Sequence, residues 1–361
     1  MKYSDLAWLS GNGPHPEVVL SSRVRLARNL NGYPFPSLGH GPSLAEVAEH
    51  LGAALRTQDD LEVLDLFRVH PLEVQLMVEQ HLISPAFSAS KDPRALALSS
   101  DARLSVMVNE EDHLRLQSML PGLQLEDAYA SALRLEEKLA EQLVFAFDRQ
   151  FGYLTSCPSN VGTGLRASAM LHLPALGWMR ALDPILSQVA RLGLAVRGVF
   201  GEGTRSVGHL VQVSNQVTLG PTEDEILAKI RAVCEQLVQY EASAREQMLR
   251  AQRLQVEDKV WRSFGLLRSA RLLEAMEVME HLSMVRLGTS LNILPEVPVA
   301  VLNALLVRTR PANLQSLAGR ELEPVERDCL RAGLVRETFL GLDRKQGEPD
   351  PTGRSEPQSP N

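Results

Sequence analysis

The chain has 361 residues, of which 44% are hydrophobic and 22% are charged, and its net charge is −7. The length predicts about two domains, each large enough to bury a core. The negative charge argues against non-specific binding to nucleic acid, and no apolar run approaches the length that crosses a bilayer. Three cysteines without a CxxC or Cys/His cluster exclude a disulfide framework and a zinc site. We therefore expect a cytoplasmic protein without a structural metal.

The first strong pattern lies near the amino terminus. Residues 1–17 form a polar segment that Gly and Pro interrupt and that lacks a signal-peptide core. From Val18 to Leu26, apolar and polar residues alternate as in a half-buried strand. Ser21, Arg23 and Arg25 would share one face of this strand. That face is either a solvated surface or a rigid pair of guanidinium groups suited to a polyphosphate.

The next segments alternate between helical and strand patterns. Apolar residues recur at helical spacing in three stretches, and the short apolar runs between them are typical of strands. The predicted helices are residues 43–56, 74–82 and 126–147, and the predicted strands are residues 95–98 and 104–108.

Three consecutive carboxylates, Glu110-Glu111-Asp112, come soon after the strand at residues 104–108. If the chain turns helically there, Glu111 and Arg115 lie on one face at i,i+4 spacing and point into one site. The alternative is a solvated turn without a function.

A loop rich in small residues, Cys157-Pro-Ser-Asn-Val-Gly-Thr-Gly-Leu-Arg-Ala-Ser168, is the second candidate site. Gly162 and Gly164 permit positive φ and a close backbone approach to a ligand. Clustered amides and hydroxyls suit an anion, and Arg166 adds a fixed positive charge. From composition alone an ordinary surface loop is the alternative. We expect residues 167–173 to continue as a helix.

The remaining chain predicts a hairpin and then helices. Strands at residues 194–200 and 209–215 flank a short loop, with Arg197 on the first. Thr222-Glu-Asp-Glu225 is a capping box that opens a long bridging helix. We therefore expect an N-terminal segment, then two domains, then a Pro-, Gly- and Ser-rich disordered tail. Their bounds are residues 1–17, 18–250, 251–342 and 343–361.

These residues favour phosphoryl transfer to a guanidinium group. There is no Walker P-loop and no protein-kinase HRD or DFG element. Phosphoryl transfer needs mainly charge neutralisation and alignment, which dispersed arginines can supply to Mg-ATP. Glu111 and Glu202 suit a planar cation, because carboxylate and guanidinium pair bidentately. A guanidinium must lose a proton to become a nucleophile, which a positioned glutamate can accept. Cys157, if it is a thiolate, could hold the same substrate.

Four motifs resemble the catalytic half of the phosphagen (guanidino) kinases over roughly residues 18–220. They are S-S-R-V-R, N-E-E-D-H-L-R, C-P-S-N-V-G-T-G-L-R-A-S and R-G-x-x-G-E. The resemblance implies an α+β fold, in which helices flank an antiparallel β-sheet of the glutamine-synthetase-like kind and a small all-helical domain follows. It also implies ATP and Mg²⁺ as cofactors and no metal bound by the protein itself.

The resemblance assigns roles to particular residues. Glu111 and Glu202 hold the guanidinium, with Glu111 as the base, and Cys157 is the reactive thiol. His81, in Q-H-L-I-S, contacts the nucleotide. The implied nucleotide contacts are Ser21, Ser22, Arg23, Val24, Arg25, His81, Arg115, Arg166, Ala167, Ser168, Ala169, Met170, Arg197, Gly198, Val199, Phe200, Gly201 and Glu202. Two departures are Ser159, where Thr is usual, and Gly203, where His is usual.

Two features indicate the bacterial protein-arginine kinases (McsB type), which this chain resembles over nearly its whole length. Phosphagen kinases carry a helical domain before the arginine strand that covers a small substrate, whereas only Met1–Ser22 precede Arg23. We expect an open site that accepts an arginine presented on a protein. Arg327, Asp328, Arg331 and Ala332 match the RDxxRA element of this group. The resemblance implies that they bind phosphoarginine as an allosteric site.

We therefore predict a protein-arginine kinase that marks proteins for degradation in quality control or stress response. The alternatives are a kinase for free arginine or another small guanidine, and an adaptor that reads phosphoarginine for a Clp protease. The expected partners are protein substrates with exposed arginines, a zinc-binding activator, a Clp-type unfoldase and a second copy of the chain in a homodimer. Neither nucleic acid nor a membrane is expected.

Overall fold

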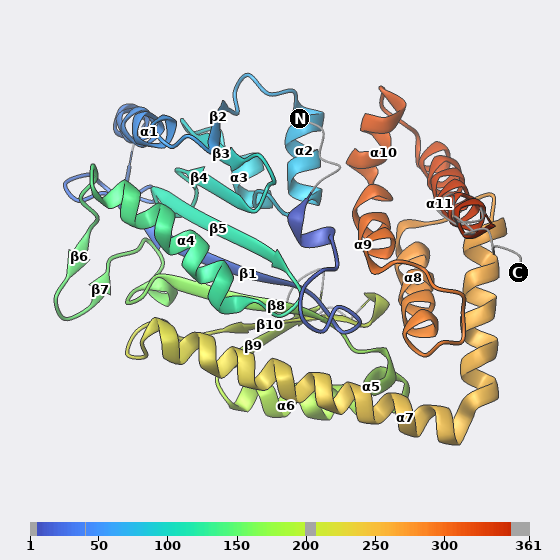
Figure 1. Cartoon of the computed structure of the whole chain (residues 1–361). Coiled ribbons are helices and arrows are strands. Elements are labelled where there is room, and N and C mark those ends of the chain that lie inside the picture. The colour runs from blue at the N-terminus through green and yellow to red at the C-terminus, as the bar shows by residue number, and fades with distance from the viewer. Residues whose placement is uncertain (1–5, 40, 199–206, 348–361) are drawn as a thin grey trace, which may run out of the picture.

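An antiparallel sheet forms the centre of the protein (Figure 1). The computed structural model describes residues 6–39, 41–198 and 207–347. The strands are β1 (Val19–Arg28), β2 (Leu61–Asp65), β3 (Ala95–Ser99), β4 (Leu104–Val108), β5 (Leu114–Pro121), β8 (Leu165–His172), β9 (Leu194–Gly198) and β10 (Leu210–Asn215), with a separate pair, β6 (Phe147–Asp148) and β7 (Gly152–Tyr153). The eight strands lie in the order β2-β3-β4-β5-β1-β8-β10-β9, and every neighbouring pair is antiparallel. The expected α+β fold is confirmed.

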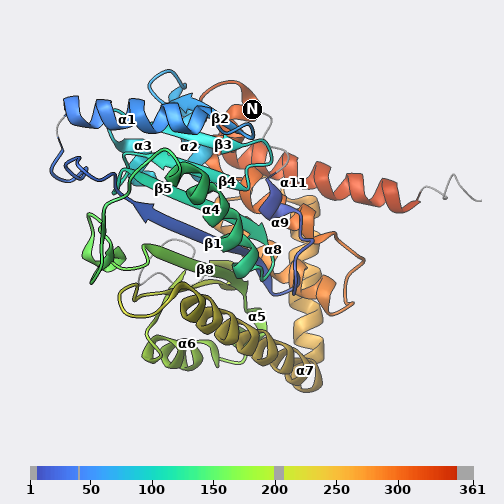
Figure 2. The same cartoon turned by 60° about the vertical axis from the view of Figure 1, so that its left-hand side comes forward.

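Helices cover one face of the sheet and gather at one of its ends (Figures 1 and 2). They are α1 (Gly41–Arg56), α2 (Pro71–Glu79), α3 (Pro85–Ala89), α4 (Leu125–Ala140), α5 (Pro174–Trp178), α6 (Leu182–Arg191), α7 (Glu223–Ser269), α8 (Ala275–Ser290), α9 (Val299–Arg308), α10 (Pro311–Ala318) and α11 (Pro324–Gly347). Helices α4 and α7 run along the same side of the sheet, and α8 to α11 form the helical C-terminal region. No described helix is long and apolar enough to cross a membrane.

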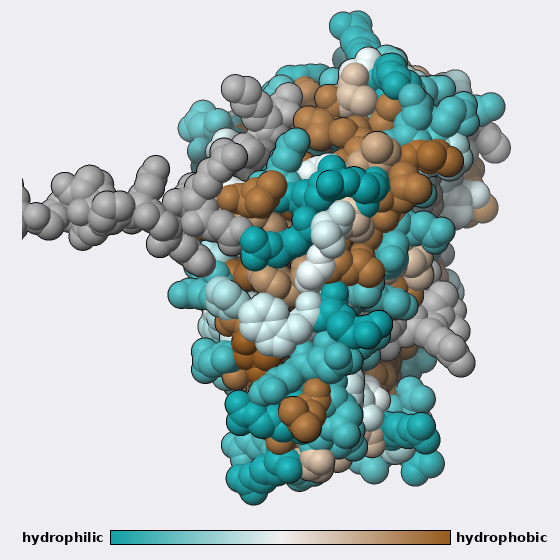
Figure 3. All heavy atoms as spheres, turned by 90° about the vertical axis from the view of Figure 1, so that its right-hand side faces the viewer, coloured by the Kyte–Doolittle hydropathy of each residue, from teal (hydrophilic) through white to brown (hydrophobic). Residues whose placement is uncertain are grey.

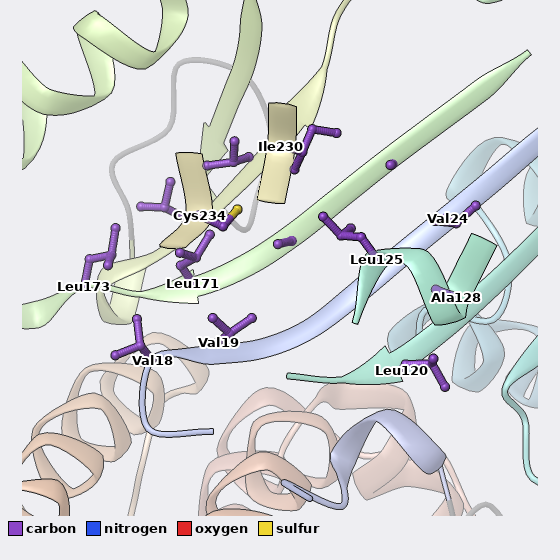
Figure 4. Close-up of a cluster of buried hydrophobic side chains, with 14 of the residues drawn as sticks. Val18, Val19, Val24, Leu120, Leu125, Ala128, Leu171, Leu173, Ile230 and Cys234 are labelled. Atoms are coloured by element: carbon purple, nitrogen blue, oxygen red, sulfur yellow. The ribbon is translucent and has the colours of Figure 1, made fainter. Parts of the chain in front are cut away.

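The main core lies between the sheet and the helices α4 and α7 (Figure 4). Leu171 on β8 lies beside Cys234 of α7, whereas Val24 on β1 lies beside Leu125 and Ala128 of α4. Because side chains alternate across a strand, the neighbours of these apolar residues face the other side of the sheet. The polar positions of β1 and β8 are therefore left for a site on that second face.

One predicted helix is a strand. Residues 167–173 were expected to be helical, but β8 runs through them between β1 and β10. Leu165 and Ala167 enter the core, whereas Arg166 and Met170 are partly exposed on the opposite face. Short Ala and Ser side chains hid this alternation in the sequence. Pairing on both edges outweighs the helical propensity of alanine.

The acidic run does not turn helically either. Residues 109–113 form the tight connection between β4 and β5, where the Asn109 amide donates to the His113 carbonyl. Arg115 lies on β5 and not one helical turn after Glu111. Asn109 takes φ +59°, a left-handed conformation that Asn adopts more readily than most residues. Two well-paired strands require this short turn, so the expected helical turn is wrong, although Glu111 and Arg115 still line one small cavity.

The long helix α7 begins as predicted. The Thr222 side chain accepts from the Glu225 amide and the Glu225 side chain accepts from the Thr222 amide, which completes the capping box. The helix continues to Ser269 but bends at Gln252, where φ is −142° and ψ is 38°. This bend lies beside the proposed domain boundary at residue 250. Helix α11 reaches Gly347, so the first residues of the expected disordered tail, 343–347, are helical.

A buried ion pair joins α4 to β1. Arg28 Nε lies 2.6 Å from Glu136 Oε1, and the Arg28 guanidinium also stacks on the Tyr153 ring, 3.4 Å from its centroid. Arg28 donates further bonds to the carbonyls of Ala27 and Thr163. The Arg28 guanidinium and the Glu136 carboxylate are therefore both buried, and each needs the charge of the other to offset its loss of solvation.

We predict that Glu136→Gln lowers the free energy of unfolding by about 3–5 kcal/mol, because the Arg28 charge stays buried without a counter-charge. Urea denaturation would measure it. The control is Glu126→Gln on the same helix, which breaks a half-exposed pair with Arg231 and should cost less than about 1 kcal/mol. Equal losses in the two variants would contradict the assigned burial effect.

Candidate active site

Five arginines lie on the face of the sheet opposite the main core. Arg25 on β1 is directly paired with Arg166 on β8, and Ala27 on β1 is paired with Arg115 on β5. Directly opposed residues share a face, as do residues two apart on one strand. Arg23 donates to Gln212 Oε1 at 3.2 Å, and Gln212 is paired with Arg197 on β9. The structure thus brings together the arginines that the sequence placed on four separate stretches.

These cations perturb one another. Burial, together with the charges of Arg115 and Arg166, lowers the pKa of Arg23 to about 10. Burial and the charges of Arg23, Arg115 and Arg166 lower the pKa of Arg25 well below its usual value. Like charges that depress each other's pKa favour a bound anion that neutralises them. The sheet face is therefore suited to a polyphosphate.

A cavity of about 420 Å³ opens beside these arginines. Its volume is typical of a small-molecule site. The predicted nucleotide residues that line it are Ser21, Arg23, His81, Arg115, Ser168 and Met170. Ser22, Val24, Ala167 and Ala169 do not line this cavity: Val24, Ala167 and Ala169 belong to the main core, and Ser22 Oγ donates to the Gly122 carbonyl. Gly198 ends β9, and Val199, Phe200, Gly201 and Glu202 lie outside the described residues.

His81 is held in an unusual conformation at this cavity. Its φ is +62°, and its carbonyl accepts from Gln117 Nε2 at 2.7 Å. Burial, then the charges of Arg23 and Arg310, lower the pKa of His81 to about 3. The imidazole is therefore neutral at pH 7 and can offer one donor and one acceptor.

A second, small cavity of about 50 Å³ holds the carboxylates. Glu110, Glu111, Arg25 and Arg166 line it, and Arg115 lines both cavities. The two spaces are thus adjacent. Carboxylates beside arginines suit a cationic acceptor next to a polyphosphate.

The loop that begins at Cys157 reaches the small cavity through Asn160, whose Nδ2 donates to Glu111 Oε2 at 3.2 Å. Cys157 Sγ lies 3.0 Å from Ser159 Oγ. Burial and the charges of Arg197 and Arg115 lower the pKa of Arg166, whereas Glu111 and Cys157 raise it. The thiol and the carboxylate therefore both lie within electrostatic range of Arg166.

Glu110 is a site residue that sequence reasoning missed. Its carboxylate accepts from Ser84 Oγ and from Arg115 Nη1, each at 2.6 Å. Burial raises the pKa of Glu110, but the Arg115 charge and the hydrogen bonds outweigh it and leave the pKa below its usual value. Glu110 thus orients Arg115. The expected helical turn directed attention to Glu111, whereas the hairpin pairs Arg115 with Glu110.

The RDxxRA element has an exposed side and a buried side. Arg331 is 2% exposed and donates to the carbonyls of Thr309 and Leu273, each at 2.7 Å, and it pairs with Asp328. Ala332 is fully buried. Arg327 is partly exposed and donates to the Leu322 carbonyl at 2.9 Å. In this conformation Arg327 and Asp328 are the members that a ligand can reach.

The fold and the family profile agree on the class. The profile of the ATP:guanido phosphotransferase C-terminal catalytic domain matches residues 44–244. The solved structure of a lombricine kinase is 25% identical and covers 69% of this chain and 71% of its own, with a TM-score of 0.58. The fold and the profile thus define a phosphotransferase with a guanido acceptor.

The relatives narrow the class. The profile of the protein-arginine kinase McsB C-terminal domain matches residues 253–350. The protein-arginine kinase of Moorella thermoacetica is 46% identical over 92% of this chain and 97% of its own. That of Symbiobacterium thermophilum is 45% identical over 91% of this chain and 95% of its own. This chain belongs to the ATP:guanido phosphotransferase family, and within it to the protein-arginine kinases.

Gly162 gives a test of the loop that carries Asn160 and Arg166. Its φ is +109°, and a Cβ there would lie 2.3 Å from the Thr218 carbonyl oxygen. Gly220 has nearly the same φ, +106°, with nothing within 4 Å of its Cβ position. The two glycines therefore share the backbone strain and differ in the close approach.

We predict that Gly162→Ala destabilises the protein more than Gly220→Ala, by about 1–3 kcal/mol, because the methyl group must displace backbone. Thermal or urea unfolding of the two variants measures the difference. Identical stabilities would mean that the loop moves away from Thr218 without cost.

Proposed function

We propose that this chain transfers the γ-phosphoryl group of Mg-ATP to arginine side chains of proteins, giving ADP and phosphoarginine. The observation that carries the proposal is the pair of adjoining cavities that share Arg115. One is large and adjoins mutually repelling arginines, and the other holds Glu110 and Glu111. A polyphosphate in the first and a guanidinium in the second would meet at Arg115.

The nucleotide occupies the large cavity, with its phosphates toward Arg25, Arg115 and Arg166. The arginines neutralise the charge of the transferred group and align it, which is most of what phosphoryl transfer requires. No three His, Cys, Asp or Glu side chains of the described residues cluster as metal ligands. Mg²⁺ usually binds substrate phosphates and keeps several waters instead of an all-protein cage. When bound, Mg²⁺ neutralises phosphate charge.

The acceptor arginine enters the small cavity, where Glu111 pairs with its guanidinium. One Nη of the substrate attacks the γ-phosphorus as the bond to the ADP oxygen breaks, and the Nη proton passes to Glu111. Asn160 holds the Glu111 carboxylate through its 3.2 Å hydrogen bond. Cys157 and Glu202 complete the proposed guanidinium contacts.

We predict that Glu111→Gln lowers kcat by about 10²–10⁴, because an amide cannot accept the proton. Its affinity for ADP should stay that of the wild type. Phosphoarginine on an unfolded protein, followed by mass spectrometry under conditions that spare acid-labile bonds, measures the rate. Glu126→Gln is the matched surface control. Near-normal phosphorylation by Glu111→Gln would remove Glu111 from this role.

The acceptor class is tested by feeding ATP with either free arginine or an unfolded protein. Labelled protein and unlabelled free arginine are the expected result. The reverse would make this a kinase for a small guanidine, and binding of phosphoarginine proteins without any transfer would make it an adaptor.

We further propose that the RDxxRA element is an allosteric phosphoarginine site. Arg327 would bind the phosphoryl group and Asp328 would pair with the guanidinium, whereas the buried Arg331 and Ala332 would support these two residues.

We predict that Arg327→Met weakens phosphoarginine binding about tenfold or more without loss of stability, since charge-assisted bonds to phosphate are strong. Arg331→Met should lower the stability by about 1–3 kcal/mol, because it leaves buried carbonyls unpaired. Calorimetry and thermal unfolding separate the two effects, and unchanged binding in both variants would refute the proposal.

The proposed cellular role follows from phosphoarginine as a modification that labels proteins. A protein-arginine kinase of the cytoplasm that labels misfolded proteins in stress would work with a zinc-binding activator and a Clp-type unfoldase. For a homodimer, support comes from apolar patches on the face of the helical C-terminal region (Figure 3). Leu254 and Trp261 in the second half of α7, and Leu272 shortly after that helix, are also exposed. Sedimentation of the purified chain would measure the oligomeric state.

A further inference from the structure

The large cavity is not built by the sheet alone. Its lining includes Met279 of α8, Leu306 and Val307 of α9, and Arg310, the residue directly before α10. Trp8, from the opposite end of the chain, also lines it. The helical C-terminal region therefore forms one wall of the proposed nucleotide site.

This wall lies at the end of the cavity that is remote from the carboxylates. Arg25 and Ala27 of β1 line the small cavity, Arg23 lies farther along the strand in the large cavity, and Leu20 lies farthest. Leu20 packs against Leu210 and Met279. Phosphates that reach Arg25 and Arg115 would leave the nucleoside at the Leu20 end.

We infer that Arg310 binds the nucleoside end of ATP, so that the helical C-terminal region takes part in nucleotide recognition. This inference rests on the proposed function. A guanidinium can donate to the ring nitrogens of a base and stack on its face. The apolar residues Met170, Met279 and Leu306 line the same cavity and provide the surface that a base requires.

Three observations indicate that this end of the cavity is a formed binding site. The buried indole nitrogen of Trp8 has no hydrogen-bond acceptor among the described residues, and such donors are usually paired. The Trp8 ring also packs edge-on against His81, with the ring centroids 5.6 Å apart. Burial lowers the pKa of Arg310 more than the nearby Glu79 carboxylate raises it, and the Arg310 charge in turn lowers the pKa of His81, so the two side chains act on the same space.

The corner that carries Arg310 is fixed to the catalytic part. The Glu79 carboxylate of α2 accepts from the amides of Ala312 and Asn313, at 2.8 and 3.0 Å, and from Asn313 Nδ2 at 2.8 Å. A carboxylate at a helix N-terminus satisfies free amides and complements the helix dipole. Arg310 is therefore presented to the cavity by a rigid support.

The experiment compares Arg310→Met with Arg308→Met, which changes an exposed arginine at the end of α9 outside the cavity. Calorimetry on the full chain measures the dissociation constants of ADP and of inorganic tripolyphosphate. Arg310→Met should weaken ADP about tenfold and change tripolyphosphate less than about twofold, since only ADP carries a nucleoside. Arg308→Met should change neither. Wild-type affinity for ADP in Arg310→Met, or an equal loss for both ligands, would overturn the inference.

Hydrogen exchange of the wild-type chain keeps the test independent of the variant's folding. ADP should protect residues 299–318 from exchange more than tripolyphosphate does, and equal protection by the two ligands would count against a role for Arg310.

Arg23→Met tests the proposed function separately, because it should weaken the binding of both ligands. If wild-type chain binds neither ligand, the nucleotide site itself is wrong. If Arg23→Met weakens both ligands but Arg310→Met binds ADP as tightly as Arg308→Met does, the proposed nucleotide site stands and only the inference about Arg310 fails.

Discussion

The repulsion among arginines held on one rigid sheet face is the constraint on which the rest of the structure depends. Arg25 and Arg166 are directly paired across two strands, and the charge of Arg115 lies close enough to lower the pKa of Arg23. The strand positions that carry them cannot move apart, because the backbone is hydrogen-bonded on both edges and packed from behind by a core. The free energy of folding thus holds together charges that a bound polyphosphate relieves.

The sequence analysis succeeded where local pattern and tertiary structure agree. The alternation in β1 and the capping box of α7 are local signals, and both elements form as expected. The prediction of a helix at residues 167–173 was wrong, because the alternation of β8 depends on Ala and Ser, whose burial is determined by the neighbouring strands. The prediction of a helical turn at Glu110-Glu111-Asp112 was wrong for a related reason, since the pairing of β4 with β5 determines the conformation of this connection.

Within the site, the sequence motifs identified the arginines but not the residues that orient them or complete the cavity around them. Glu110 is adjacent to the expected base in the sequence, and only the folded structure shows that it forms an ion pair with Arg115. Trp8 and Arg310 belong to opposite ends of the chain, and no spacing in the sequence connects them to a cavity on the sheet. Residues that act through long-range packing leave no local periodicity by which to find them.

The bend of α7 at Gln252 has a practical consequence for dissecting this protein. It looks like a natural place to cut the chain, yet the helices that follow it return to cover Leu20 and Leu210 at the end of the sheet. A fragment that stops at the bend would leave these side chains in water and the Glu79 carboxylate without the amides that it caps. The two parts are therefore better understood as halves of one folded unit than as interchangeable modules.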